Sequence, residues 1–388
     1  MNASELSSPA GDVNAVVGGY LRDMAFVQPT QPQMFGYKRA AAAIFGLETS
    51  LTDLARESNE AFPKIAGIGP SSSRIIREVL ESGGSPTVEY AIDASGRRPE
   101  IERRRSLRQY FLSRAEVRRV IRDPRCGGPA LNEYRGDLQM HSEWSDGTPS
   151  VAAIAAACEA RGYSYAAVTD HSYGLRIAGG ISPAEAAEQR RAIDLVNDVT
   201  GSQFRLLQGI EANIGPDGQL DLTPEEAAGF DIVLAAPHSR LRKLDDQTER
   251  LLTALDNPAV RILAHPRGRI TGSRAGIVAD WDAVFDRAAR RAVAIEIDGD
   301  PARQDIDYTL AGRALAAGCI FALDSDAHTT GQLAYAETAV AHARLAGIPS
   351  DQIVNCWTLD RLLGWVSEPV GECRDELYEK RPSASAKP

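Results

Sequence analysis

The sequence is poor in cysteine, in aromatic residues and in long apolar runs. Its five cysteines lie far apart, without any Cys-x-x-Cys pair. This pattern argues against a disulfide framework or a Cys-based zinc site and fits a reducing cytoplasm. No stretch approaches the ~18 apolar residues needed to span a bilayer. The first residues (MNASELSSPAGDV) lack the basic and apolar parts of an export signal. We therefore expect a cytoplasmic protein with no membrane partner.

Composition and charge narrow the class further. The chain has 388 residues, of which 43% are hydrophobic, 25% charged and 6% aromatic. These proportions exclude collagen-like and fully disordered proteins, and the length is enough for one large core or for one such core with a small satellite. The net charge of −10 argues against a protein that coats nucleic acid. However, residues 97–125 hold eleven arginines and four acidic residues, either as a solvated helix face or as a phosphate-binding surface.

Three zones differ in texture. Residues 1–90 show helical spacing over 36–47, 50–62 and 64–83. Residues 91–135 form an arginine-rich connector broken by Gly and Pro. The polar tail, residues 367–388, is expected to be disordered.

The middle zone, residues 136–366, alternates short apolar runs with helical segments. Runs that are apolar throughout predict strands buried on both faces of a parallel sheet. Seven strands in this length favour a closed barrel over an open sheet. The expected strands are 137–141, 165–171, 204–214, 231–238, 260–266, 293–299 and 320–328, and the expected helices are 150–162, 183–199, 245–256, 280–290, 305–317 and 331–346.

Histidine is rare, and its placement is the strongest signal in the chain. Of six histidines, five end different predicted strands, and acidic residues stand at equivalent places. The carboxyl ends of parallel strands converge on one mouth, so these side chains should meet there. The histidines are His141, His171, His238, His265 and His328, and the acidic residues are Asp170, Glu211, Glu296 and Asp326. The sixth, His342, lies within a predicted helix and is expected at the surface.

Imidazoles and carboxylates without thiolates favour Zn, Mn or Fe over Ca or Mg. Their number exceeds the needs of one tetrahedral site, so we expect two or three divalent ions sharing a carboxylate. Ions held ~3.5–4 Å apart can activate water as hydroxide and stabilise both oxygens of a phosphoryl displacement. Phosphoester hydrolysis is therefore the predicted chemistry.

The motifs at these positions resemble those of the PHP (polymerase and histidinol phosphatase) family, in the form attached to bacterial family-X DNA polymerases. They are GDLQMHSEWSDG (136–147), VTDHS (168–172), GIEANI (209–214), PHSR (237–240), LAHP (263–266), IEIDG (295–299) and SDAH (325–328). The resemblance implies an α/β fold, a distorted (β/α)7 TIM-like barrel over 136–366 with a trinuclear metal centre at its mouth.

The resemblance also implies which residues hold each ion. The first ion would bind His141, Glu211 and Asp326, with Gln139 where many family members have His. Glu211 would be shared with a second ion. The second ion would also bind His238 and His265, and the third Asp146, His171 and His328.

Further roles are expected around the ligands. Asp326, His328, Arg240 and Asp170 are the predicted catalytic group, and Asp170 and Glu296 would orient ligands. Arg176, Arg240 and Arg267 follow ligand motifs and are candidates to bind substrate phosphate. Arg240 matches the family's HSR. The alternative for each arginine is an ordinary surface residue of a barrel loop.

The N-terminal zone contains Ile65-Ala66-Gly67-Ile68-Gly69, which resembles the hairpin of a helix-hairpin-helix module. Such glycines permit a tight turn whose backbone N–H groups can bind one DNA phosphate. The candidate DNA contacts are Gly67, Gly69, Ser71 and Arg74. The alternative is a plain helical hairpin.

Together these features predict a metal-dependent phosphoesterase acting on nucleic acid, with DNA 3′ ends or single strands as partner. It would be a 3′–5′ exonuclease or 3′-end-processing phosphatase in DNA repair. The alternative is a small-molecule phosphatase acting on histidinol phosphate or a nucleotide 3′,5′-bisphosphate, and a non-enzymatic DNA-binding protein is a third reading. A polymerase palm would need about 100 further residues, more than 91–135 provides.

Overall fold

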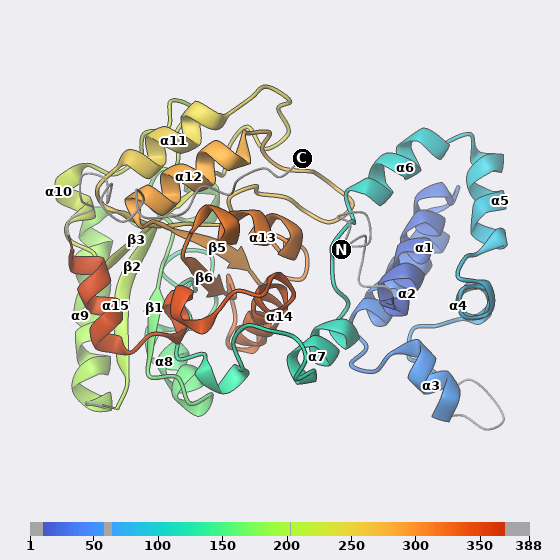
Figure 1. The fold of residues 1–388 in the computed structure, drawn as a ribbon, viewed down its shortest axis with the longest axis horizontal. Helices are drawn as coiled ribbons and strands as arrows, with labels where there is room; N and C mark the ends of the chain where they lie inside the picture. Colours follow the sequence, from blue (N-terminus) through green and yellow to red (C-terminus); the bar gives the residue numbers. More distant parts are fainter. Residues whose placement is uncertain (1–10, 58–63, 202, 369–388) are drawn as a thin grey trace, which may run out of the picture. The chain divides into compact units, whose positions relative to one another are not determined.

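The computed structural model describes residues 11–57, 64–201 and 203–368. The chain forms two compact units, one of residues 1–126 with 270–275 and the other of residues 127–269 with 276–388. We call them the helical unit and the barrel unit (Figure 1). The helical unit contains α1 (Val13–Val27), α2 (Gln31–Phe45), α3 (Leu51–Glu57), α4 (Pro70–Ser82), α5 (Pro86–Ser95), α6 (Arg98–Ser106) and α7 (Arg114–Arg122).

The helical unit has its own core. Helix α1 packs against α2, α4 and α5, and the apolar side chains between them are fully buried, among them Leu21, Ile44 and Ile76. Asp12 caps α1 by accepting from Ala15 N, and it also accepts from the backbone and hydroxyl of Ser113, the cap of α7. One carboxylate thus fixes the starts of two helices.

The expected helices of this unit differ from the observed ones mainly at their starts. Helix α2 begins at Gln31 because Pro32 suits a first turn, whose N–H groups need no partner within the helix. Helix α4 begins only at Pro70, because residues 65–68 form a turn in which Gly67 has φ +80° and Gly69 caps the helix. The expected helix over 50–62 extends into residues 58–62, which lie outside the described residues.

The arginine-rich band is largely neutralised within the helical unit. Arg98 pairs with Glu89 and Asp93 at 2.9 and 2.6 Å, while Arg105 pairs with Glu89 and Asp23 at 2.6 and 2.7 Å. Other arginines of the band pair with Asp23, Glu48, Glu116 and Asp123. Several of these acidic partners lie outside residues 97–125, so local charge counting could not find them. Much of the band therefore has an internal role.

The barrel unit is built on six parallel strands, hydrogen-bonded in the order β1-β2-β3-β4-β5-β6. The strands are β1 (Tyr165–Val168), β2 (Arg205–Asn213), β3 (Ile232–Ala236), β4 (Val260–Leu263), β5 (Ala294–Asp298) and β6 (Phe321–Asp324). The helices are α8 (Val151–Ala160), α9 (Pro183–Thr200), α10 (Pro224–Ala227), α11 (Thr248–Asp256), α12 (Trp281–Arg291), α13 (Tyr308–Ala317), α14 (Ala336–Ala346) and α15 (Leu359–Ser367). This alternation confirms the predicted α/β class with a parallel sheet.

The first expected strand, residues 137–141, is not a regular strand. It runs between β1 and the end of β6, where Ala167 N donates to Asp137 O at 2.9 Å and His141 N donates to Ala327 O at 2.8 Å. Two of its N–H groups bond instead to side chains, Leu138 N to Asp324 Oδ1 and Met140 N to Thr169 Oγ1. Because side chains replace part of the ladder, only a single bridge at Met140 remains.

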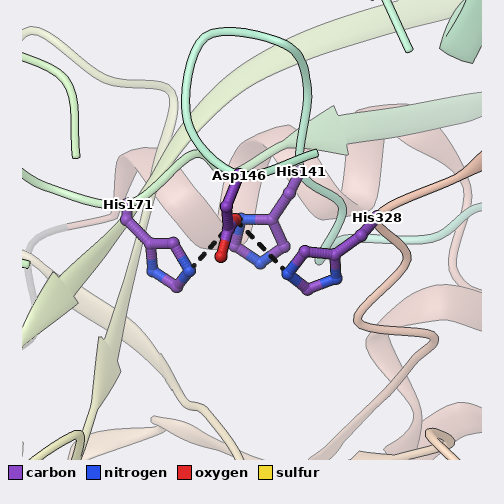
Figure 2. A group of neighbouring side chains, drawn as sticks. All are labelled: His141, Asp146, His171 and His328. Carbon is purple, nitrogen blue, oxygen red and sulfur yellow. Dashed lines mark ion pairs between the residues drawn. The ribbon is translucent and has the colours of Figure 1, made fainter. Parts of the chain in front are cut away.

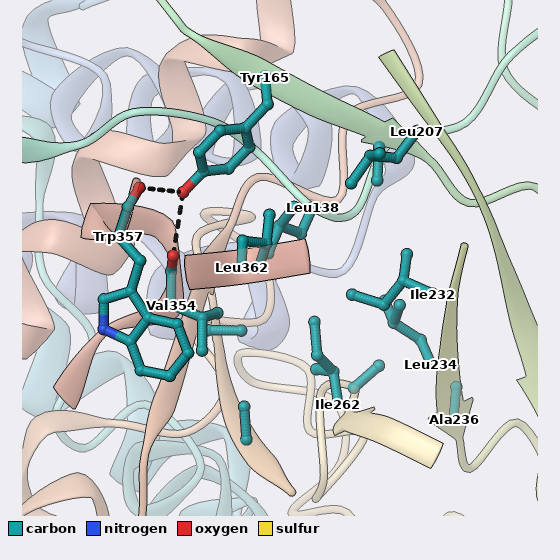
Figure 3. Close-up of a cluster of buried hydrophobic side chains, with 14 residues drawn as sticks. Leu138, Tyr165, Leu207, Ile232, Leu234, Ala236, Ile262, Val354, Trp357 and Leu362 are labelled. Atoms are coloured by element: carbon teal, nitrogen blue, oxygen red, sulfur yellow. Dashed lines mark hydrogen bonds between the residues drawn. The ribbon is translucent and has the colours of Figure 1, made fainter. Parts of the chain in front are cut away.

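The core of the barrel unit is closed by residues from the end of the chain. Leu138, Leu207, Leu234 and Ile262 pack with Leu362 of α15 (Figure 3). The buried Tyr165 hydroxyl donates to carbonyl oxygens of Val354 and Trp357, at 3.0 and 3.1 Å. Within the part of the chain that the structure describes, we find no helix long and apolar enough to cross a membrane.

His342 is a correction to the sequence analysis, which expected it at the surface. It is fully buried, its Nδ1 accepts from Tyr308 N at 3.1 Å and its Nε2 lies 2.8 Å from Gln304 Oε1. Helix α14 packs against α13, β5 and β6 and buries the residues around His342 on several faces. A position within a predicted helix was not enough to place His342 at the surface, because both sides of this helix are covered.

Candidate metal centre

The candidate ligands come from the carboxyl ends of successive strands and from one loop. His171, His238 and His265 follow β1, β3 and β4, Glu211 lies near the end of β2, and Asp326 and His328 follow β6. His141 and Asp146 lie in the loop before α8. The structure thus brings together side chains that are spread over 188 positions of the sequence, 141–328.

One cluster centres on Asp146. Its Oδ1 lies 3.3 Å from His328 Nε2, 3.5 Å from His171 Nε2 and 3.9 Å from His141 Nδ1. Figure 2 shows the carboxylate between the imidazoles of His171 and His328, with His141 beside it. The His141 ring stacks on both of the other rings, with centroids 4.4 Å apart. These four residues can hold a metal ion together.

A second cluster centres on Glu211, which is fully buried. Its Oε2 lies 2.9 Å from His171 Nδ1 and 3.4 Å from His141 Nε2, and its Oε1 lies 2.8 Å from His265 Nε2 and 3.3 Å from His238 Nε2. One carboxylate therefore faces four imidazoles, with two on each oxygen. Such an arrangement suits a carboxylate that bridges two cations.

Asp326 joins the clusters from the end of β6. Its Oδ1 lies 3.1 Å from His141 Nε2. The sequence-based grouping of His141, Glu211 and Asp326 therefore corresponds to neighbouring atoms in the structure. His171 contacts both Asp146 and Glu211 through its two ring nitrogens, so the clusters are continuous.

The donor atoms fit divalent cations. Among the described residues, buried polar atoms without a hydrogen-bond partner include His141 Nδ1 and both amide atoms of Gln139. Buried polar atoms normally have partners, and imidazole nitrogens and carboxylate oxygens are ligands of Zn, Mn and Fe. Gln139 is fully buried in the same segment as His141.

The electrostatics of these side chains match this reading. Burial would raise the pKa of Asp146, but His171 and His328 hold it well below its usual range. Burial would lower the pKa values of the two histidines. For His171, the charge of Glu211 and contacts with Asp146 outweigh burial and raise its pKa to about 10. For His328, Asp146 and Asp326 do the same and raise its pKa to about 9. The site is thus built for positive charge beside its carboxylates.

Asp170 holds the two ligand-bearing loops in place. Its Oδ1 accepts from Ser142 N at 2.8 Å and from Ser145 Oγ at 2.5 Å, and its Oδ2 accepts from Ser142 Oγ at 2.5 Å. Gln189, a buried residue of α9, also donates to Oδ2 at 2.5 Å. Since Ser142 and Ser145 adjoin His141 and Asp146, Asp170 holds the loop that carries these two candidate ligands.

Unusual backbone geometry helps to position the candidate ligands in three places. His265 and Asp326 have φ values of +27° and +50°, which non-glycine residues rarely adopt. Glu296 accepts a hydrogen bond from His265 N and so holds that backbone. A Cβ atom on Gly147 would lie 2.2 Å from His141 O, so only glycine lets the loop from His141 to Asp146 fold back.

The three arginines predicted to bind phosphate lie in different settings. Arg240 pairs with Asp245, and Arg267 NH1 lies 3.1 Å from Asp307 Oδ2. Arg176 is exposed in the short 3-10 helix η2 (Arg176–Ala178). Two of the three guanidinium groups therefore have carboxylate partners outside the ligand clusters.

Sequence analysis missed Arg303. Its Nε lies 3.3 Å from Asp326 Oδ2, beside a candidate ligand. Arg303 stands five residues after β5, in a loop outside the recognised motifs. The only signal available was the density of acidic residues around it, in the sequence DGDPARQDID.

The DNA-contact candidates lie in the helical unit. Gly69 caps α4, and Ser71 and Arg74 are exposed on its first turns. A pair of helices around this turn is not described in full, because residues 58–63 fall between α3 and the turn. The role of Gly67, Gly69, Ser71 and Arg74 in DNA binding stays a prediction.

Comparison with known proteins gives three sequence relatives of note. The chain is 37% identical over 230 residues to the "DNA polymerase/3'-5' exonuclease PolX" of Bacillus subtilis, a match that covers 59% of this chain and 40% of that protein. A "Probable phosphatase" of Syntrophotalea carbinolica is 28% identical over 230 residues, covering 56% of this chain and 90% of the relative. Another "Probable phosphatase", of Thermoanaerobacter sp., is 27% identical over 187 residues, covering 45% and 69%.

These matches confirm the resemblance found in the motifs, since the chain is homologous to all three proteins. The chain spans well under half the length of the Bacillus subtilis relative. Among solved structures, a histidinol phosphate phosphatase of Lactococcus lactis complexed with Zn, L-histidinol and phosphate matches with 13% identity and a TM-score of 0.39, covering 53% of this chain and 92% of that one. No family model matches the chain.

Proposed function

We propose that this chain is a metal-dependent hydrolase of phosphoester bonds, of the PHP type, with its centre at the carboxyl ends of the strands. The observation that carries the proposal is Glu211, a buried carboxylate with two imidazoles on each oxygen. A single carboxylate among four imidazoles is difficult to explain as core packing, because burial of charged groups is costly without counter-charge.

The proposed ligands fall into three groups, of which the first two share Glu211. His141, Glu211 and Asp326 would hold one ion, with Gln139 beside them, while Glu211 with His238 and His265 would hold a second. Asp146, His171 and His328 would hold a third. Two or three divalent ions of Zn, Mn or Fe, when bound, would activate water and neutralise charge on the phosphoryl oxygens.

Other side chains have supporting roles in this proposal. Asp170 and Glu296 hold ligand-bearing backbone, while Asp326 and His328 line the reacting centre. Arg240, with Arg176 and Arg267, would approach the substrate from surrounding loops. The distorted (β/α)7 barrel is supported by the residues of segment 136–141 that bond to both β1 and the end of β6.

Nucleic acid is the substrate we favour, attacked as a 3′–5′ exonuclease or a 3′-end-processing phosphatase. The support is the 37% identity to a relative whose name includes 3′-5′ exonuclease. DNA would be recognised partly through the turn before α4, with Gly67, Gly69, Ser71 and Arg74. The internal pairing of the arginine band leaves the turn as the main candidate surface of the helical unit.

A small-molecule phosphomonoesterase is the second candidate. It is favoured by the Syntrophotalea carbinolica relative named as a probable phosphatase, because the match covers 90% of that relative's length. The net charge of −10 also suits a small substrate better than a long polyanion. Histidinol phosphate and nucleotide 3′,5′-bisphosphates are the monoesters to test.

The deciding experiment compares three substrates in the presence of Mn²⁺: a 5′-labelled oligonucleotide, p-nitrophenyl phosphate and histidinol phosphate. The full chain is used, and Asp326→Ala serves as the blank. Stepwise shortening of the oligonucleotide, absent in the blank, supports the nuclease. Fast monoester turnover with an intact oligonucleotide supports the phosphatase. Full hydrolysis by Asp326→Ala in metal-replete buffer would sink the proposed mechanism.

A further inference from the structure

Among the described residues, Arg303 forms an ion pair with a candidate metal ligand, Asp326. Its Nε lies 3.3 Å from Asp326 Oδ2, 3.6 Å from Asp298 Oδ2 and 3.8 Å from Asp300 Oδ2. Arginine stays protonated at any working pH, and these three carboxylates surround its guanidinium. The guanidinium is therefore a permanent cation inside the centre.

The loop that carries Arg303 is rigidly held. Arg269, which is almost fully buried, donates from Nε to Arg303 O at 2.9 Å and to Gln304 O at 3.1 Å. His342 contacts the Gln304 side chain from α14, and Asp305 exchanges two backbone hydrogen bonds with Asp298 at the end of β5. The backbone of Arg303 is thus fixed before any substrate arrives.

The donors of Arg303 are not consumed by these contacts. The three ion pairs join Nε to carboxylate oxygens at 3.3 Å or more, and none of the described hydrogen bonds is donated by this guanidinium. By contrast, Arg105, which serves the helical unit, bonds to Asp23 and Glu89 at 2.7 and 2.6 Å. A side chain with 22% of its surface exposed can present its terminal nitrogens to a ligand.

We propose that Arg303 binds the phosphoryl oxygens of the substrate at this centre, donating from its two terminal nitrogens while Nε stays against Asp326. A planar guanidinium with two parallel donors matches two oxygens of a phosphate group. The proposal rests on the proposed phosphoesterase function and deepens it. It assigns the phosphate contact nearest the reacting atoms to a residue outside the recognised motifs, in addition to the loop arginines.

The test measures binding of inorganic phosphate to the metal-loaded full chain by isothermal titration, with metal content determined for each protein. Arg303→Gln should weaken phosphate binding at least about tenfold, as expected for loss of hydrogen bonds to a charged group, at unchanged metal content. Arg303→Lys keeps the charge but loses the paired donors, so its phosphate affinity should lie between those of the wild type and Arg303→Gln. Arg313→Gln removes an exposed guanidinium paired with Asp282 and should bind phosphate like the wild type.

Wild-type phosphate affinity in metal-loaded Arg303→Gln would overturn the inference. If that variant does not fold, Arg303→Lys decides, and wild-type affinity there has the same meaning. If Arg303 only balances the charge of Asp326, Asp298 and Asp300, its replacement would change the metal content or the melting temperature and leave the phosphate affinity at the wild-type value. The proposed function fails separately, if the wild-type chain hydrolyses neither the oligonucleotide nor the two monoesters.

Discussion

Asp170 lies outside both candidate ligand clusters, yet it holds the loop that carries two of the candidate ligands, His141 and Asp146. Its two oxygens accept four hydrogen bonds, three of them from the loop between His141 and Asp146 and one from Gln189. In Asp170→Asn one carboxylate oxygen becomes an NH2 group. This group would face the donors of Ser142, Ser145 or Gln189 and displace the loop from His141 to Asp146. We expect metal affinity to fall about 10- to 100-fold.

Equilibrium dialysis of the variant against Mn²⁺ or Zn²⁺ measures this loss, and excess metal should restore part of the activity. The control is Asp194→Asn, an exposed position on the same helix as Gln189. Unchanged metal affinity in Asp170→Asn would show that the loop holds its shape without this carboxylate.

His342 makes stability depend on pH in the acid range. Burial, together with the positive charge of Arg269, lowers its pKa to about 3. In the unfolded chain His342 therefore binds a proton near pH 6.5, whereas in the folded chain it stays neutral until the pH nears 3. The contribution of neutral His342 to the free energy of unfolding is complete above pH 6.5 and is lost as the pH falls toward 3. The loss should be about 1.4 kcal/mol per pH unit within that window.

Urea unfolding at pH 6.5 and pH 5 checks this, comparing the wild type with His342→Asn. Asparagine can accept from Tyr308 N but does not titrate. The variant should be less stable at pH 6.5, and the difference should shrink by about 2 kcal/mol at pH 5. A constant difference between the two proteins would mean that His342 is protonated in the folded state.

At the scale of elements, the junction between β6 and segment 136–141 depends on Asn355. Its side chain accepts from Leu323 N at 2.7 Å and donates to Gly136 O and Asp324 Oδ1 at 2.9 and 2.8 Å. Asn355→Ala would leave Leu323 N and Gly136 O without these partners and would remove one of the two donors to Asp324 Oδ1, which still accepts from Leu138 N. The expected cost is about 2–4 kcal/mol. Denaturant unfolding followed by tryptophan fluorescence measures it, with the exposed Asn132→Ala as control. Equal stability of the two variants would contradict this role.

The same junction marks where sequence analysis reached its limit. Apolar runs predicted β1 to β6 because a strand buried on both faces leaves a local pattern. The segment 136–141 carries the same pattern, yet its N–H groups bond to Asp324 and Thr169, which are distant in sequence. Its irregular pairing is a tertiary effect, and no local signal records it.

The site was predictable to the extent that its residues end strands. The side chains of six candidate ligands are neighbours in the structure, because parallel strands bring their ends together; these are His141, His171, Glu211, His238, His265 and Asp326. Arg303 and Gln189 were missed, since one lies in a loop and the other in a helix. Both act through contacts with residues far away in sequence, Asp326 and Asp170.

At the scale of the whole molecule, the two units divide the chemistry unequally. All candidate metal ligands belong to the barrel unit, and so do the four tryptophans, Trp144, Trp281, Trp357 and Trp365. The helical unit has a separate apolar core built from α1, α2, α4 and α5. Tryptophan fluorescence therefore reports on the unit that would bind metal, while far-UV circular dichroism reports on both.

Metal should stabilise the barrel unit by mass action. At a free metal concentration of 100 times Kd the gain is about 2.7 kcal/mol, which corresponds to a rise in Tm of about 5–10 °C for a unit of this size. We expect this rise in the tryptophan-detected melting of chelated protein when Mn²⁺ is returned. Asp326→Ala removes a carboxylate that faces His141 at 3.1 Å, so its rise should be much smaller. An equal rise in Tm in both proteins would show that the stabilising metal binds away from Asp326. No rise in Tm in either protein would contradict the proposed metal centre.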